Sequence, residues 1–227
     1  MNASAVTKME IIGHLAARHG FIRYLELCTP TTGMLFDRLD RNVLTTAHRL
    51  MYNAPPDHDD GLAVDFRTEG LDIGPCLSVI HASGQRYDII LVDPYHDYAC
   101  SWRDLAAAFE LVEAGGCLVV HDCLPPDRAM AAPEYDVGSW CGVTYKAYLD
   151  FVSSRNLDYQ TIDADYGCGV IRKPGPRDVG ADRSARDDRL WQEWHAIGND
   201  FDRAFSFFET HKVALLRLIA PHAFLAG

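Results

Sequence analysis

The fold is decided by the stretch Tyr87-Asp88-Ile89-Ile90-Leu91-Val92-Asp93, a continuous apolar run that ends in an acid. Runs of this kind are typical of strands that are buried on both faces of a parallel sheet. Two further runs predict strands, namely the mostly apolar run Phe21 to Cys28 and the run Cys117-Leu118-Val119-Val120-His121-Asp122, which ends in polar groups. The first of these precedes the turn Thr29-Pro30-Thr31-Thr32-Gly33, as expected where a strand opens a βα unit.

Helical segments alternate with the strands. The pattern Thr7-x-x-Glu10 is a capping box that predicts an N-terminal helix, and Ser101-x-x-Asp104 begins another helix after the run that ends at Asp93. This alternation predicts an α/β fold, a three-layer sandwich with a mainly parallel sheet. A further strand is expected at 42–47. The segments 158–163 and 167–172 flank a tight turn and should therefore pair antiparallel.

The chain divides into three parts on its composition. Residues 1–172 form the α/β domain, with an irregular insertion at about 51–75 that we interpret as a lid or substrate loop. Residues 173–188 are a polar linker, and 189–227 form a helical extension. An apolar stripe with helical spacing runs through this extension at Leu190, Trp194, Ile197, Phe201, Phe205 and Phe208. The stripe either packs on the domain or forms a homodimer interface.

Charge and composition exclude several classes of protein. The 227 residues carry a formal net charge of −11 and show no local basic patch, so neither nucleic acid nor an anionic membrane surface is an expected partner. No stretch approaches the length of about 20 apolar residues that spans a bilayer. The first ten residues lack the features of a signal peptide, and the seven scattered cysteines suit a reducing compartment. We therefore expect a cytoplasmic protein.

The chemistry is expected where the buried strands end. Asp93 and His96 follow one strand, and His121 and Asp122 follow another. The carboxyl ends of parallel strands meet at one edge of the sheet, where ligands bind. Two carboxylates and two imidazoles there fit a divalent-metal site, or a general base with its orienting acid. The third alternative is a solvated set of loop ends with one structural His–Asp hydrogen bond.

Glu26 is a carboxylate inside an apolar strand. Its burial is unfavourable unless it is hydrogen-bonded. It could accept hydrogen bonds from the amides of the following turn, or approach a bound cationic ligand. That turn holds one glycine and no G-K-[S/T], so it is not a P-loop.

Several of these segments together resemble the class I S-adenosylmethionine-dependent methyltransferases. The resemblance rests on Arg23 to Leu27, on Asp93-Pro94-Tyr95-His96-Asp97-Tyr98, on Gly115 to Asp122, on Trp140 to Lys146 and on Asp163 to Ile171. It is nearest to a small-molecule branch with the strand-end patterns D-G-x-H-x-Y and H-D. The family implies a Rossmann-like, seven-stranded sheet whose last strand is antiparallel, with the cofactor over the turn that follows the first strand.

The resemblance also implies roles for individual residues. The cofactor S-adenosylmethionine would contact Glu26, Cys28, Thr29, Thr32, Gly33 and Asp93. His96 and His121 would be the candidates for a base or a substrate contact, with Asp93 as a third catalytic residue. Asp93 and Asp122 would bind Mg²⁺ if the reaction uses a metal.

The chain departs from the family pattern at three points. Cys28 stands where the first glycine of the loop is usual, Pro94 replaces a glycine, and Val43 to Arg49 holds no acid for the ribose. Three functions follow. The first is methyl transfer to a hydroxyl or amine of a small metabolite or sugar-like acceptor. The alternatives are a methyltransferase-like protein that only binds a ligand or partner, and a different transferase or lyase that uses the strand-end acids.

Overall fold

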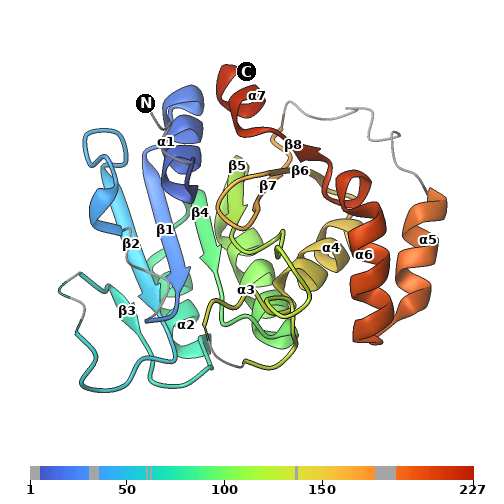
Figure 1. The fold of residues 1–227 in the computed structure, drawn as a ribbon. Helices are drawn as coiled ribbons and strands as arrows, with labels where there is room; N and C mark the ends of the chain where they lie inside the picture. Colours follow the sequence, from blue (N-terminus) through green and yellow to red (C-terminus); the bar gives the residue numbers. More distant parts are fainter. Residues whose placement is uncertain (1–5, 31–35, 60, 62, 136–137, 177–187) are drawn as a thin grey trace, which may run out of the picture.

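A mixed, mainly parallel sheet forms the centre of the computed structural model, which describes residues 6–30, 36–59, 61, 63–135, 138–176 and 188–227 (Figure 1). Within these residues the sheet has eight strands in the order β3-β2-β1-β4-β5-β7-β6-β8. Their bounds are β1 Arg23–Cys28, β2 Thr46–Met51, β3 Phe66–Arg67, β4 Tyr87–Asp93, β5 Val112–Val120, β6 Asp158–Ile162, β7 Cys168–Arg172 and β8 Leu218–Ile219. Strand β7 is antiparallel to both of its neighbours, and the other neighbouring pairs are parallel. The predicted α/β fold with an antiparallel final hairpin is confirmed, and β8 adds a strand to the seven expected.

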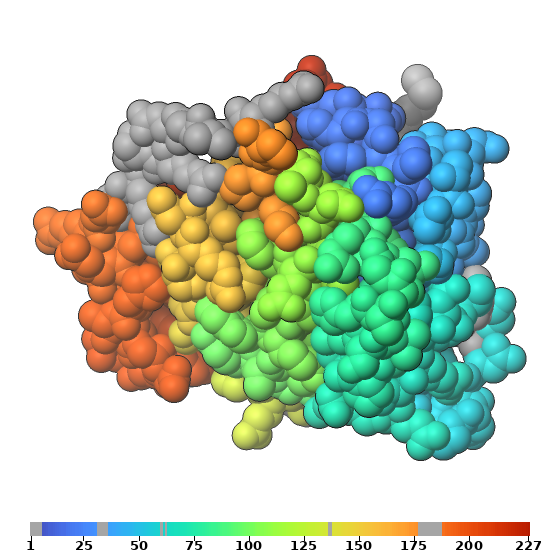
Figure 2. Space-filling model, turned by 180° about the vertical axis from the view of Figure 1, so that it is seen from behind, coloured from blue at the N-terminus to red at the C-terminus, as the bar shows by residue number. Residues whose placement is uncertain are grey.

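Alternate residues of the central strands face two separate layers of helices. Ile89 and Leu91 of β4 pack with α1 Lys8–His19, with the 3₁₀ helix η1 Phe36–Arg38 and with α7 Pro221–Ala226. Ile90 and Val92 pack with the opposite layer, which contains α2 Gly74–Ser83, α3 Tyr98–Leu111, α4 Thr144–Ser154, α5 Asp188–Ile197 and α6 Phe201–Leu216. Figure 2 shows this second layer, whose segments follow one another from teal to orange. The sheet is therefore covered on both faces, as the apolar strands predict.

The position expected for the second strand is wrong by about four residues. The apolar pair Val43-Leu44 lies in a turn in which the amides of both residues donate to the carbonyl of Asp40. Strand β2 begins at Thr46 and carries Arg49, which is completely buried. A buried arginine makes this strand look polar, and so the sequence pattern points to the wrong segment.

Part of the insertion at 51–75 joins the sheet. Its residues Phe66 and Arg67 form β3, which pairs parallel with β2 through Leu50 and Met51. Most of the expected linker 173–188 lies outside the described residues. In the part of the chain that the structure describes, we find no helix long and apolar enough to cross a membrane.

The apolar stripe of the C-terminal extension packs within the chain. It is divided between α5 and α6 at Gly198, which has a φ of 65°. Trp194 donates from Nε1 to Asp150 of α4 at 2.7 Å, and the ring of Phe208 lies 4.5 Å from that of Tyr145. Strand β8 then joins the sheet beside β6. Trp194 and Phe208 are already buried by residues of their own chain. The homodimer stays a prediction.

Removing the Phe208 ring should destabilise the fold strongly. Phe208 is completely buried, so Phe208→Ala should lower the free energy of unfolding by about 3–5 kcal/mol. Val213→Ala on the same helix is the matched control, because Val213 is 65% exposed and should change stability little. Urea unfolding measures both variants. Equal stabilities of the two would contradict the packing of α6 on the α/β domain.

Candidate active site

The ends of β4 and β5 bring the predicted acids and imidazoles together. Val92 is paired with Val120, so Asp93 and His121 come next on adjacent strands, and the His121 amide donates to the Val92 carbonyl at 3.0 Å. Asp122 then turns the chain with a φ of 60°. We call Asp93, His96, His121 and Asp122 the strand-end cluster.

His96 is held in place by the segment that precedes α4. The amide of Val143 donates to the His96 carbonyl at 3.0 Å. Gly142 lies so close that a Cβ atom there would be 2.1 Å from the same carbonyl oxygen, and its φ of 55° also favours glycine. On the other side, Asp97 caps α3 by accepting the amide of Cys100 at 2.7 Å. The backbone at His96 is therefore fixed from both directions.

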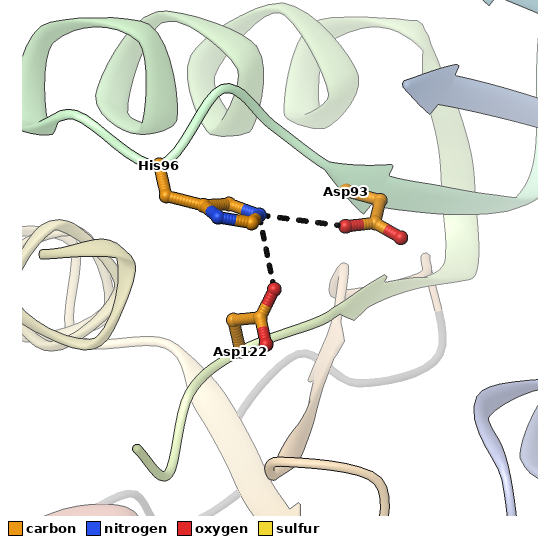
Figure 3. Close-up of side chains that lie close together, drawn as sticks. All are labelled: Asp93, His96 and Asp122. Atoms are coloured by element: carbon orange, nitrogen blue, oxygen red, sulfur yellow. Dashed lines mark ion pairs between the residues drawn. The ribbon is translucent and has the colours of Figure 1, made fainter. Parts of the chain in front are cut away.

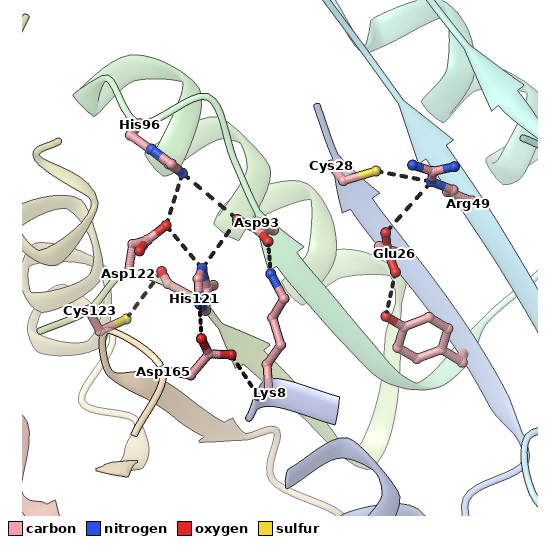
Figure 4. A network of polar contacts seen from close by, with 11 residues as sticks. Lys8, Glu26, Cys28, Arg49, Asp93, His96, His121, Asp122, Cys123 and Asp165 are labelled. Carbon is pink, nitrogen blue, oxygen red and sulfur yellow. Dashed lines mark hydrogen bonds and ion pairs between the residues drawn. The ribbon is translucent and has the colours of Figure 1, made fainter. Parts of the chain in front are cut away.

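Asp93, His96 and Asp122 of the strand-end cluster point toward one another (Figure 3), and Figure 4 adds His121 beside them. His96 Nε2 lies 3.0 Å from Asp122 Oδ2 and 3.8 Å from Asp93 Oδ1. His121 Nδ1 lies 3.0 Å from Asp122 Oδ2 and 3.5 Å from Asp93 Oδ1. On its far side, His121 Nε2 lies 3.5 Å from Asp165 Oδ1 in the β6–β7 turn. His96 thus lies between two carboxylates, and His121 contacts three.

Burial and charge compete to set the pKa values here. Burial alone would lower the pKa of His96, but hydrogen bonding to Asp122 and Asp93 raises it to about 9. The pKa of His121 is likewise raised well above its usual value, because Asp93 and Asp122 outweigh burial. Burial alone would raise the pKa of Asp93, yet Lys8 and His121 hold it well below its usual range. The carboxylates are therefore ionised, and they favour positive charge between them.

The same carboxylates meet the requirements of a divalent cation. One ligand atom each from Asp93, His96 and Asp122 lies within 4.8 Å of the others. Two carboxylates and one imidazole are a donor set that binds magnesium or a divalent first-row transition-metal ion such as manganese. The residues expected to bind a metal, Asp93 and Asp122, thus lie together with His96 as a possible third ligand.

Lys8 is part of the site and was not predicted from the sequence. Its ammonium forms an ion pair with Asp93 Oδ2, and its amide donates to Asp165 Oδ2 at 2.9 Å (Figure 4). Lys8 lies on the helical stripe of Ile11, Ile12 and Leu15, all of which are buried. A lysine on an apolar stripe was the available signal, since lysine is rarely buried without a partner.

A cavity of about 800 Å³ opens above the strand-end cluster. Thr29 and Asp93 of the predicted cofactor contacts line it, whereas Thr32 and Gly33 lie outside the described residues. Asn53, two residues beyond β2, and Pro55 and His58 of the insertion also line it. Asn53 was missed because β2 was placed too early.

Aromatic side chains form another wall of the cavity. Trp140 lies 5.3 Å from the ring of His96 and 5.6 Å from that of Tyr95, measured between ring centroids. Tyr135 stacks edge-on against the same indole at 5.6 Å. An apolar wall thus faces the acidic floor, as in many small-molecule sites.

Glu26 and Cys28 lie in the sheet beneath the cavity and are not among its lining residues. Glu26 accepts a hydrogen bond from Tyr24 at 3.0 Å, and its Oε1 lies 3.7 Å from Nε of Arg49 on β2. The same Nε donates to Cys28 Sγ at 3.4 Å. Within the described residues, Glu26 therefore has an internal cation, Arg49, as its partner.

The stability of the protein should depend on the titration of Glu26. Burial raises the pKa of Glu26 from 4.5 to about 7, with Tyr24 and Arg49 opposing the rise. The folded state therefore holds this proton more tightly than the unfolded state. Its stabilising effect is complete below pH 4.5 and is lost as the pH rises to about 7.

Glu26→Gln should remove this pH dependence. Relative to the variant, the wild type should lose up to about 3 kcal/mol of unfolding free energy between these two pH values. Urea unfolding at a series of pH values gives the difference, and Glu209→Gln on α6 supplies a surface control. A wild-type-minus-variant difference that does not change with pH would contradict the raised pKa.

Comparison with solved structures identifies the fold. Cofactor-bound Rv0187 from MTB matches with a TM-score of 0.54 and 18% identity, over 77% of this chain and 84% of that one. The O-methyltransferase from Bacillus cereus in complex with SAH matches with a TM-score of 0.52 and 12% identity, over 73% of this chain and 79% of that one. No family model and no curated protein matches the sequence. The chain has the fold of the class I S-adenosylmethionine-dependent methyltransferases.

Proposed function

We propose that the protein transfers the methyl group of S-adenosylmethionine to a hydroxyl or amine of a small metabolite or sugar-like acceptor. The observation that carries this proposal is the strand-end cluster at the floor of a cavity of about 800 Å³, at the carboxyl ends of the strands of this fold. The methyl group moves from the sulfonium sulfur to the acceptor atom, and the acceptor loses a proton. The protein has to align the two reactants and accept that proton.

His96 is our candidate for the base. His96 lines the cavity, and Asp122 at 3.0 Å from Nε2 orients the ring. Because the pKa of His96 is about 9, the imidazole becomes neutral and able to accept a proton as the pH rises toward that value. A second cation bound by Asp93 and Asp122 would lower this pKa and have the same effect. A Mg²⁺ ion bound by Asp93 and Asp122 would supply positive charge beside the acceptor atom. His121 would hold Asp93 and Asp122 in place.

The cofactor would occupy the side of the cavity formed by Thr29, Asn53 and Asp93. The amide of Asn53 can both donate and accept hydrogen bonds, which suits the two hydroxyls of a ribose. The acceptor would then lie against Trp140 and Tyr95, near His96. The open cavity beside Pro30 favours a ligand-binding site over a closed, inactive one.

Isothermal titration with S-adenosylmethionine tests this proposal first. We expect saturable binding. The absence of binding heat at about millimolar cofactor would contradict the proposal, because a dissociation constant of about 1 mM corresponds to a binding free energy of only about −4 kcal/mol. Formation of S-adenosylhomocysteine with a panel of small hydroxyl and amine compounds then separates an enzyme from a binding module. Running this assay with Mg²⁺ and with a chelator measures the metal requirement.

A further inference from the structure

Lys8 is the one lysine or arginine among the described residues that line the cavity. Two buried carboxylates, Asp93 and Asp122, line the same cavity. A ligand anion placed near those carboxylates is repelled, and a ligand cation is attracted. His96 and His121 also line the cavity, but His96 Nε2 and both ring nitrogens of His121 already face carboxylates. The Lys8 ammonium has one carboxylate partner and further N–H donors, so it is the most favourable position for an anionic group of a ligand.

S-adenosylmethionine carries both signs of charge. Its sulfonium and its ammonium suit the acidic floor of the cavity, but its carboxylate does not. We propose that Lys8 binds the carboxylate at the amino-acid end of the cofactor and thereby selects cofactors that carry this group. This inference rests on the function proposed above and assigns one subsite of that site to a residue of α1.

The Lys8 side chain is preorganised for a contact with the cofactor carboxylate. Its ammonium has three N–H donors, and Asp93 Oδ2 accepts from it, which leaves donors for a second oxygen. The Lys8 amide is bound to Asp165 Oδ2 at 2.9 Å, and the capping box of Thr7 and Glu10 fixes the start of α1. The Lys8 side chain is only 8% exposed, so little rotamer freedom remains to be lost on binding. Thr29, at the turn after β1, lines the same cavity.

Two ligands that differ only in the carboxylate test the inference. Decarboxylated S-adenosylmethionine keeps the adenosine, the sulfonium and the ammonium. Isothermal titration of the full chain should give at least about tenfold tighter binding of S-adenosylmethionine, or about 1.4 kcal/mol. Lys8→Met should bind both ligands with equal affinity, whereas Lys8→Arg should keep the preference. Lys212→Met on α6, outside the cavity lining, is the control and should behave as the wild type.

The outcomes separate this inference from the proposed function. A wild type that binds both ligands equally well overturns the role of Lys8 and leaves the methyltransferase proposal standing. A wild type that binds neither ligand overturns both. A Lys8→Met variant that keeps the preference makes Lys8 a counter-ion of Asp93 alone and overturns the inference. If Lys8→Met fails to fold, the double variant Lys8→Met with Asp93→Asn removes both charges together. If that variant still prefers S-adenosylmethionine over the decarboxylated ligand, the inference is likewise overturned.

Discussion

Replacing Asp93 with Asn should abolish methyl transfer, with kcat/KM reduced by at least about 10³-fold, or about 4 kcal/mol of transition-state stabilisation. Asp93 is the carboxylate that Lys8, His96 and His121 share. The neutral amide has the same shape, so the loss reports charge rather than packing. Formation of S-adenosylhomocysteine measures the effect, and Asp158→Asn, at an exposed position of β6, is the control.

The same substitution should also destabilise the fold, because it leaves the Lys8 ammonium buried without its anion. Breaking a buried ion pair from one side lowers unfolding free energy by about 3–5 kcal/mol. Adding Lys8→Met should restore most of this stability and none of the activity. A double variant that regains turnover, or an Asp93→Asn enzyme with normal turnover, would show that the site is wrongly placed.

His96→Gln should lower kcat by about 10²- to 10⁴-fold, the usual contribution of a general base. Glutamine retains a hydrogen-bonding group near Asp122 but cannot accept a proton at neutral pH. Affinity for S-adenosylmethionine should change little, so titration calorimetry and turnover together distinguish a lost base from a lost cofactor site.

His81→Gln is the matched control for this substitution, because His81 is exposed on α2 and is absent from the cavity lining. We expect its turnover to equal that of the wild type. The wild-type pH profile of kcat should have a rising limb that His96→Gln lacks. If the variant keeps both its turnover and this limb, His96 is a bystander and His121 becomes the candidate.

The strands with continuous apolar runs were predicted correctly because both of their faces are covered. β4 and β5 alternate Ile89 with Ile90, and Leu118 with Val119, between two apolar layers, so the runs 89–92 and 117–120 are hydrophobic throughout. Since their carboxyl ends point the same way, the meeting of Asp93, His96, His121 and Asp122 followed from the strand pattern alone. Their catalytic and metal-binding roles stay predictions.

The errors arose where a polar residue is paired inside the fold. Arg49 is buried against Glu26, and this long-range pair hid β2. The role of Glu26 in cofactor binding stays a prediction. Lys8 was hidden in the same way, because its partner Asp93 is 85 residues distant. A local sequence pattern cannot reveal a partner so far along the chain. The structure shows these partners directly, as ion pairs between two strands or between a helix and a strand.

In the function proposed above, Gly142 would link the choice of acceptor to the position of His96. The indole of Trp140 forms a wall of the cavity, and two residues later the chain presses against the carbonyl of His96 with no room for a Cβ atom. In the proposed reaction, an acceptor that shifted the backbone at Trp140 would press Gly142 against this carbonyl and move His96. Redesign for bulkier molecules would therefore have to enlarge the opposite side, around Asn53 and Pro55, and leave the tryptophan where it stands.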